Sequence, residues 1–175
     1  MARRRIREYI LIPNERAALL DEKTLKKLRE RLNCRIEVEG NEVRVEGAAY
    51  DEYNAKNVIQ AFARGFELDK AYRLLEEGVF FQSINMKDFF KSKDQLTRVK
   101  ARIIGEKGRA KTYIEDASGV DMAVYGGTVS TIGSVDDLKV ADAAIQILLD
   151  GGMHKTAYKI MEMEKRKIKE RDMNA

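Results

Sequence analysis

Gly105 and Gly108 stand three residues apart, between a basic helical stretch and a second amphipathic stretch. Glycine has no Cβ and adopts positive φ readily, so this Gly-x-x-Gly turn lets the chain double back and lets a sugar-phosphate backbone approach closely. Lys107 and Arg109 supply positive charge at the same place. A helix that starts near Arg109 adds backbone amides, which are suited to anions. The pattern predicts a clamp for the backbone of a nucleic acid.

The predicted clamp lies in a locally basic part of a chain whose net charge is only +4. Residues 87–111 carry nine basic residues against three acids, whereas residues 112–154 carry one against seven. Such a basic track is typical of nucleic-acid binding, and a set of solvated helix faces is the alternative interpretation. The predicted RNA contacts are Arg98, Lys100, Arg102, Ile104, Gly105, Glu106, Lys107, Gly108, Arg109, Lys111, Thr112, Met122 and Tyr125.

Five side chains near the clamp have a structural explanation beside the functional one. Ile104 and Met122 are candidates either for an apolar floor under unstacked bases or for the core. Tyr113 and Tyr125 either stack on a base or cover the edge of a core. Thr112 either hydrogen-bonds a phosphate or stabilises the first turn of its helix.

Helix start and stop signals define the elements around the clamp. Ser92 and Gln95 have the spacing of a capping box for a helix that runs to Ile104. Gly119 is expected to end the next helix in a left-handed conformation, and Ser134 to cap a last one. The expected elements are strands over 80–88, 121–125 and 128–133 and a helix over 109–118. This β-α-GxxG-α-β-β-α order is the type I KH arrangement, in which the GxxG loop clamps about four nucleotides.

The same pattern occurs twice in the chain. Shifting the sequence by 86 residues aligns 14–76 with 100–162 without a gap and gives thirteen identities in 63 pairs. The identities include Arg16 with Arg102 and Asp51 with Asp137, the latter interpreted as the capping-box acid of a repeated helix start. We interpret the chain as a tandem duplication.

The two copies differ at the clamp. Opposite Gly105–Gly108 the first copy has Leu19-Leu20-Asp21-Glu22, with no glycine and two acids. The window 100–111 has net charge +4, and the matched window 14–25 has −1. A phosphate would meet side-chain bulk and like charge in the first copy, so we expect only the second copy to hold RNA and the first to be a scaffold or protein-binding surface.

The predicted fold class is α+β, with two tandem type I KH domains, each β-α-α-β-β-α. The first, degenerate and lacking GxxG, is expected over residues 1–78, and the second over 79–175, including a basic C-terminal helix. No Ser-, Pro- or Gly-rich tether separates them, so we expect the two domains to pack together as one rigid body.

Other classes of function find little support in the sequence. No apolar run approaches the roughly 18 residues of a membrane span, and the charged start at residues 1–7 is unlike a signal peptide, so a cytoplasmic protein is expected. Cys34, the single cysteine, is expected to be a small core residue. His154 is expected at a helix start in a capping or surface role. The pair Asp136-Asp137 is better explained by helix capping than by metal binding, so no catalytic residue, metal or cofactor is predicted.

Residues 102–115, Arg-Ile-Ile-Gly-Glu-Lys-Gly-Arg-Ala-Lys-Thr-Tyr-Ile-Glu, resemble the second KH domain of the Krr and Partner-of-Nob family of small-subunit ribosome assembly factors in its archaeal form. The resemblance covers nearly the whole chain, including a first KH domain without GxxG. A distinctive feature is Lys111, where ordinary KH domains have an apolar residue. Glu106 departs from the family, because many relatives have a basic or small residue there.

The resemblance implies a non-catalytic protein that binds single-stranded small-subunit rRNA near its 3′ end during ribosome assembly and pre-rRNA maturation, alongside a PIN-type endonuclease and other assembly or translation factors. The alternative is a protein-protein adaptor that recruits a nuclease or translation factor through the first KH domain and the basic C-terminal helix, with incidental RNA contact. A nuclease or exosome subunit is a weaker alternative, because the chain lacks an S1-like segment and catalytic acids.

Overall fold

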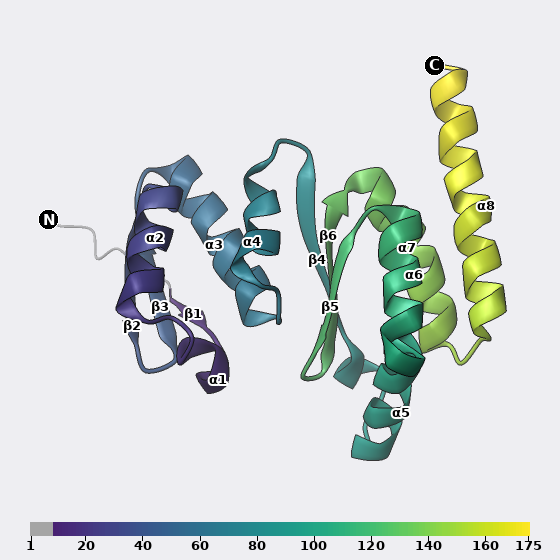
Figure 1. Cartoon of the computed structure of the whole chain (residues 1–175), viewed down its shortest axis with the longest axis horizontal. Coiled ribbons are helices and arrows are strands. Elements are labelled where there is room, and N and C mark those ends of the chain that lie inside the picture. The colour runs from purple at the N-terminus through teal and green to yellow at the C-terminus, as the bar shows by residue number, and fades with distance from the viewer. Residues whose placement is uncertain (1–8) are drawn as a thin grey trace, which may run out of the picture. The chain divides into compact units, whose positions relative to one another are not determined.

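The computed structural model describes residues 9–175, so the charged start at residues 1–7 lies outside the described residues. The chain divides into two compact units, with the boundary between Leu75 and Glu76. Both units combine helices with a three-stranded antiparallel sheet, which makes the fold α+β (Figure 1). Among residues 9–175, none of the helices has both the length and the apolar character that a membrane span requires.

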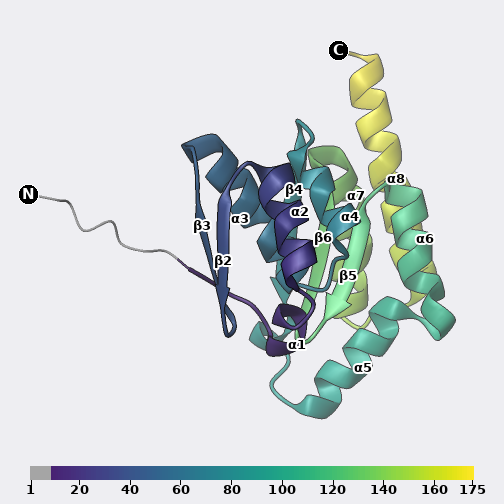
Figure 2. The same cartoon turned by 60° about the vertical axis from the view of Figure 1, so that its left-hand side comes forward.

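The first unit has a sheet in the order β1-β3-β2. Helices α2 and α3 lie on one face of it (Figure 2). Its elements are β1 (Ile10–Leu11), α1 (Asn14–Ala17), α2 (Glu22–Leu32), β2 (Arg35–Glu39), β3 (Glu42–Glu46), α3 (Ala49–Ala63), α4 (Leu68–Ala71) and a 3₁₀ turn over Tyr72–Leu75. Cys34 is buried just before β2, as expected for a small core residue, and its burial raises the pKa of the thiol.

The second unit has a sheet in the order β4-β6-β5. Its elements are β4 (Val79–Asn85), α5 (Lys93–Ile104), α6 (Arg109–Ser118), β5 (Asp121–Tyr125), β6 (Thr128–Ser134), α7 (Val135–Leu149) and α8 (His154–Met173), with 3₁₀ turns over Met86–Asp88 and Glu106–Gly108. The core between sheet and helices contains the fully buried side chains of Ile103, Ile114, Ile132 and Ile145.

The capping and helix-stop residues predicted in the second unit begin and end helices at the positions expected from the sequence. Ser92 and Gln95 make both hydrogen bonds of a capping box at the start of α5, and Ser134 and Asp137 do the same at α7. Gly119 ends α6 with φ of 90°, in the left-handed conformation. The predicted helix over 109–118 and strand over 121–125 are confirmed.

Two predictions about elements were wrong. The strand expected over 80–88 ends at Asn85, because the Asn85 side chain accepts a hydrogen bond from the Lys87 amide and starts a 3₁₀ turn. Asp51 is not a capping-box acid: the N-cap of α3 is Ala48, which has no side-chain acceptor, and Asp51 accepts a hydrogen bond from the Asn33 side-chain amide at 2.8 Å instead.

The 86-residue shift that aligns the sequence also aligns the elements. It carries β2 onto β5 and α3 onto α7 at both ends of each element. It also carries α4 onto the first turn of α8, but the first unit has only a short 3₁₀ turn after α4, whereas α8 continues to Met173. The long C-terminal helix therefore has no full counterpart in the first unit.

Candidate nucleic-acid interface

The loop between α5 and α6 turns through two conformations that favour glycine. Gly105 has φ of 75° and ψ of 172°, a region essentially restricted to glycine. A Cβ on Gly105 would stand 2.7 Å from the Ala110 amide nitrogen, so no side chain fits. Gly108 has φ of 76° and ψ of 10°, with open space where its Cβ would be. Packing requires the first glycine, and backbone conformation alone favours the second.

The start of α6 is open to an anion. Gly108 is its N-cap and provides no side-chain hydrogen bond, and the first turn contains no acidic residue. The first amides of a helix have no partner within the helix, and they form the positive end of its dipole. Lys107, itself left-handed with φ of 52°, and Arg109 are both exposed beside these amides. The Arg109 amide donates to the carbonyl oxygen of Glu106, so exposed positive charge meets the remaining amides of this first turn.

The structure brings most of the predicted contacts to this loop and its flanking helices. Exposed residues of the set are Arg98, Glu106, Lys107, Arg109 and Thr112, and half-buried ones are Lys100, Arg102, Ile104, Gly105, Gly108, Lys111 and Tyr125. Arg98 lies on α5, about two turns before the loop. Tyr125 lies at the end of β5, where its carbonyl oxygen accepts a hydrogen bond from the Thr128 hydroxyl. Ile104 is half-buried, whereas its neighbour Ile103 is a core residue.

Met122 is a core residue, which is one of the two roles considered for it; the other was an apolar floor under bases. Its side chain is 2% exposed and belongs to the core of the second unit, so it offers no surface to a base. Its backbone amide donates a hydrogen bond of 2.8 Å to Glu115 Oε1, which links β5 to α6. Lys111 Nζ lies 3.0 Å from both oxygens of the same carboxylate. Lys111 is thus held at the β5 side of α6, and Glu115 is the residue that positions it.

Arg102 also has an internal partner. Its Nη2 donates a hydrogen bond to the carbonyl oxygen of Gly152, in the turn before α8. Arg16, the aligned residue in the first unit, donates from Nη2 to the carbonyl oxygen of Phe66, which the 86-residue shift carries onto Gly152. The same internal contact is therefore made in both units. Arg102 therefore has a structural role, for which its identity with Arg16 was the sequence signal. Its RNA contact stays a prediction.

His154 has a role that the sequence did not indicate. It is the first residue of α8 rather than its cap, which is Met153. Its Nε2 lies 2.7 Å from the carbonyl oxygen of Arg102 near the end of α5. Because a carbonyl oxygen only accepts, Nε2 carries the proton in this contact. His154 therefore fixes the start of α8 beside the helix that leads into the GxxG loop.

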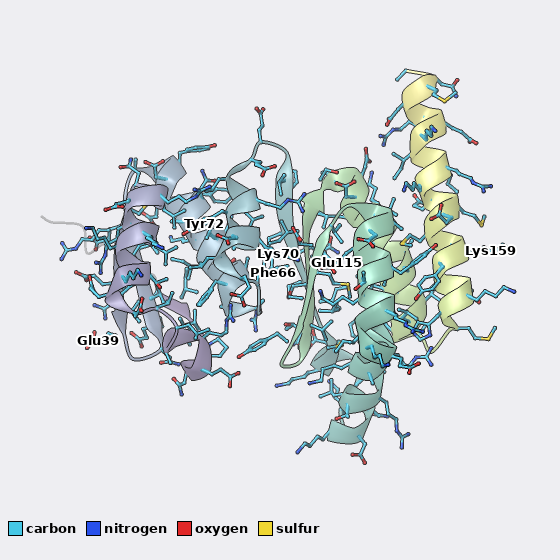
Figure 3. The ribbon with its side chains drawn as sticks, in the orientation of Figure 1. Glu39, Phe66, Lys70, Tyr72, Glu115 and Lys159 are labelled. Carbon is cyan, nitrogen blue, oxygen red and sulfur yellow. The ribbon has the colours of Figure 1, made fainter. Side chains whose placement is uncertain are left out.

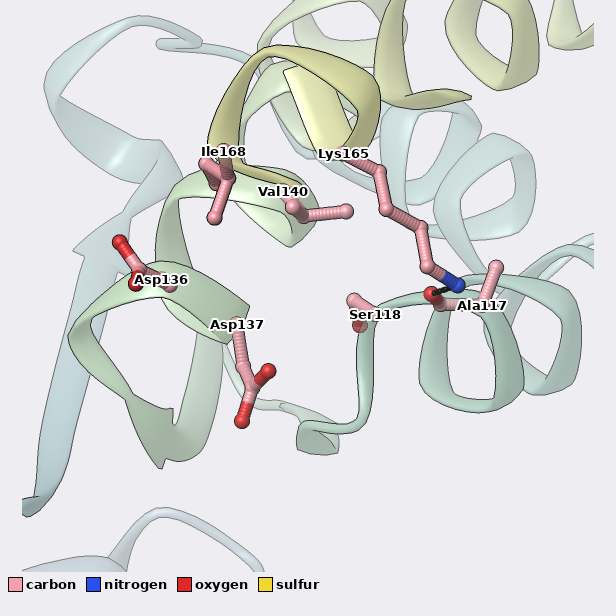
Figure 4. Close-up of a pocket in the computed structure, with 7 residues that line it drawn as sticks. All are labelled: Ala117, Ser118, Asp136, Asp137, Val140, Lys165 and Ile168. Atoms are coloured by element: carbon pink, nitrogen blue, oxygen red, sulfur yellow. Dashed lines mark hydrogen bonds between the residues drawn. The ribbon is translucent and has the colours of Figure 1, made fainter. Parts of the chain in front are cut away.

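The carboxylates of Asp136 and Asp137 both have structural partners. They line a small cavity of about 90 Å³ where α6, α7 and α8 meet (Figure 4). Asp137 completes the capping box of α7. Asp136 accepts hydrogen bonds from both terminal nitrogens of Arg171, at 3.2 and 2.8 Å, and this guanidinium lowers the pKa of the Asp136 carboxyl. Within residues 9–175 no cluster of three or more His, Cys, Asp or Glu side chains is arranged to hold a metal ion.

A three-stranded antiparallel sheet, a helical layer and a GxxG loop between two helices define the second unit as a type I KH domain. Residues 80–166 match the PNO1 second-domain form of the family described as the eukaryotic-type KH domain, KH-domain type I. Dim2p from Pyrococcus horikoshii is 34% identical in sequence with a TM-score of 0.81, and the alignment covers 89% of this chain and 98% of that one. The chain belongs to the PNO1/Dim2p family of KH-domain proteins.

Other relatives extend the comparison. KH domain-containing protein MJ0443 of Methanocaldococcus jannaschii is 29% identical over 171 residues, covering 93% of this chain and 75% of the relative. The pre-rRNA-processing protein PNO1 of Chaetomium thermophilum is 28% identical over 149 residues, and the match covers 81% of this chain and 58% of that longer protein. A structure of a complex of a/eIF2alpha, aDim2p and rRNA from P. horikoshii contains a chain with 34% identity and a TM-score of 0.84, with 91% of this chain covered and 94% of that one.

Proposed function

We propose that this chain is a non-catalytic RNA-binding protein that holds rRNA through the GxxG loop of its second unit. The observation that carries the proposal is the start of α6, where an uncapped helix end, two left-handed residues and exposed cations meet. Backbone amides at such a site are good partners for phosphate oxygens. The existence of a complex of the P. horikoshii aDim2p with rRNA supports rRNA as the ligand.

The RNA proposed is single-stranded small-subunit rRNA near its 3′ end, bound during ribosome assembly and pre-rRNA maturation. Single strands suit a GxxG clamp, because their backbone is free to follow the loop and their bases are free to be read beside it. Lys107 and Arg109 neutralise phosphates directly at the loop, and Arg98, Lys100 and Lys111 extend the positive field along α5 and α6. Ile104, Glu106, Thr112 and Tyr125 complete the proposed contact surface.

We also propose that the first unit is a degenerate type I KH domain, so that the chain consists of tandem KH domains over residues 1–78 and 79–175. Its element order after β1 and its sheet order match those of the second unit, which supports this interpretation. Its own turn lacks both glycines, and the proposed role of this unit is that of a scaffold or protein-binding surface.

Protein partners form the second part of the proposal. The a/eIF2alpha in the complex of the P. horikoshii relative favours a translation factor as one partner, and a PIN-type endonuclease is proposed as another. An adaptor whose RNA contact is incidental is therefore the alternative function. In either case we expect the protein to act in the cytoplasm.

Crosslinking in cells, followed by sequencing of the bound RNA, separates the two functions. The rRNA-binding proposal predicts a crosslink peak at the 3′ end of the small-subunit rRNA. That peak should disappear when Gly108 is replaced by Asp, whereas the variant should still copurify with protein partners. Absence of an RNA peak, with protein partners retained, would support the adaptor.

A further inference from the structure

Helix α8 is held firmly against the second unit along one side. Its own residues Ala157 and Met161 are fully buried against the rest of the unit. Lys165 Nζ donates a hydrogen bond of 2.8 Å to the carbonyl oxygen of Ala117 at the end of α6, and Arg171 pairs with Asp136 at the start of α7. Lys165 lies at the C-terminal end of α6, where the helix dipole favours a cation, and Arg171 is held by the Asp136 carboxylate. The helix therefore presents its opposite side in a fixed position.

The seven cations of α8 divide into two groups according to whether they have an internal partner. Three have internal partners: Lys165 and Arg171 as above, and Lys167 with Glu164 at 3.3 Å. The other four are exposed and make no ion pair with any residue of the described range 9–175: Lys155, Lys159, Arg166 and Lys169. Their spacing of four, seven and three residues puts all four on one side of a helix. We name these four residues the α8 basic face.

Figure 3 shows Lys159 projecting away from the body of the second unit. From Lys155 to Lys169 the face is about 21 Å long, at the helical rise of about 1.5 Å per residue. Glu162 and Glu170 are interspersed along the same side, so cations outnumber acids by two to one there. A row of unpaired cations on a rigid helix is suited to a row of phosphates, because no internal salt bridge must be broken to bind them.

An aromatic pair connects this face with the GxxG loop. The rings of Tyr113 on α6 and Tyr158 on α8 are in contact in a tilted arrangement, with centroids 4.0 Å apart and planes at 32°. Tyr113 remains 40% exposed. Arg109 precedes Tyr113 by one helical turn on α6, and Lys155 precedes Tyr158 by three residues on α8. Cations therefore flank an exposed aromatic surface, which is the usual arrangement of a single-strand stacking site.

We propose that single-stranded RNA leaving the GxxG loop passes over Tyr113 and Tyr158 and continues along the α8 basic face. This extension rests on the proposed function, since it needs RNA in the loop. It lies on the α8 side of α6, whereas Lys111 and Glu115 lie on the β5 side, so the two surfaces are separate. Tyr113 provides the stacking surface for a base, and Lys155, Lys159, Arg166 and Lys169 neutralise the following phosphates.

RNAs of two lengths distinguish binding along the α8 basic face from binding at the GxxG loop. An RNA of about six nucleotides is sufficient for the loop alone, because a GxxG loop holds about four nucleotides. An RNA of about sixteen nucleotides is long enough to reach α8, since the basic face is only about 21 Å long. The test variant is Lys155→Gln/Lys159→Gln, in which glutamine keeps the helix propensity of lysine. The matched control is Lys139→Gln/Lys167→Gln, which removes the same charge at exposed positions outside the face.

We expect the unmodified chain to bind the longer RNA at least about tenfold more tightly, with stacking and phosphate contacts both contributing. The test variant should lose most of this gain, and its salt slope for the longer RNA should fall by about 1.4, at about 0.7 for each phosphate that is no longer neutralised. Its affinity for the short RNA should equal that of the unmodified chain. The control should match the unmodified chain with both RNAs.

Equal behaviour of test variant and control would overturn the extension, as would an unmodified chain that gains nothing from the longer RNA. In both cases retained binding of the short RNA leaves the clamp intact. Failure to bind either RNA would contradict the proposed function itself. Preference of the α8 face for a duplex of the same length would also overturn the single-strand assignment.

Discussion

The turn before α2 and the turn before α6 are aligned by the 86-residue shift, and the two helix starts are capped differently. At α2, the Asp21 carboxylate accepts a hydrogen bond of 2.8 Å from the Thr24 amide, and hydrogen bonding to Thr24 lowers the pKa of Asp21. At α6, Gly108 offers no acceptor and the first turn has no acid. The first unit supplies its own anion, whereas the second leaves that position open.

The features that the two units share explain their common fold, and the turn at which they differ is the one proposed to bind RNA. The element order up to α3 and α7, the sheet order, and the contact of Arg16 with Phe66 or of Arg102 with Gly152 are common to both. At the helix start, the two copies differ in the short segments 19–22 and 105–108. The turn that carries the proposed anion site is therefore a place where the two units differ in both capping residue and charge.

The largest effect is expected from Gly105→Ala. Its backbone conformation is essentially restricted to glycine and its Cβ would collide with Ala110, so the free energy of unfolding should fall by about 2–5 kcal/mol. RNA binding should be abolished as well. Leu19→Ala is the matched control, because Leu19 is the aligned residue and is 54% exposed. Urea denaturation measures both variants, and equal stability of the two would contradict the packing argument.

Gly108→Asp should weaken RNA binding with a smaller effect on folding. Space is open at this position, and aspartate tolerates the left-handed conformation at a cost of about 1 kcal/mol. A carboxylate beside the free amides should reduce affinity at least about tenfold, since hydrogen bonds to charged groups contribute about 1.5–3 kcal/mol. Gly108→Asn tests the charge alone. Fluorescence anisotropy with a short single-stranded RNA should show a clearly smaller loss for Asn, and identical losses would argue against charge as the cause.

The smallest effect is expected at Asp21. Because its folded pKa is lowered, the Asp21 carboxylate stabilises the fold above its ordinary pKa of 3.8, and this contribution disappears as the pH falls through the lower folded value. Asp21→Ala should therefore be less stable than the unmodified chain at neutral pH, and the two should converge in acid. RNA affinity should not change. Thermal unfolding between neutral pH and about pH 3 measures the difference, and a constant gap would rule out the titration of Asp21.

Local signals explain which features of the fold were predictable from the sequence. The capping box at Ser92, the left-handed Gly119 and the cap at Ser134 each act within a few residues, so the sequence alone is sufficient to define α5, α6 and α7. The 86-residue repeat added the expectation of the same element order in both halves. The end of β4 at Asn85 was missed, because its side chain competes with the strand for a nearby amide.

The candidate site was less predictable, because its side chains find partners far along the chain. Arg102 contacts Gly152 and is contacted by His154, fifty residues or more away. Met122 could face surface or core depending on the strand register alone, and the register places it in the core. Basic composition predicted a charged surface, but it did not distinguish the cations that hold the fold from those left free.

The central claim is that only the second turn holds RNA, and charge reversal at two aligned positions tests it most directly. Arg109 and Lys23 are related by the 86-residue shift, and both are exposed in the first turn of a helix, where an acid is well tolerated. We predict that Arg109→Glu weakens binding to a single-stranded RNA from the 3′ end of small-subunit rRNA by about tenfold, whereas Lys23→Glu changes it less than about twofold. Equal losses at the two positions would contradict the account.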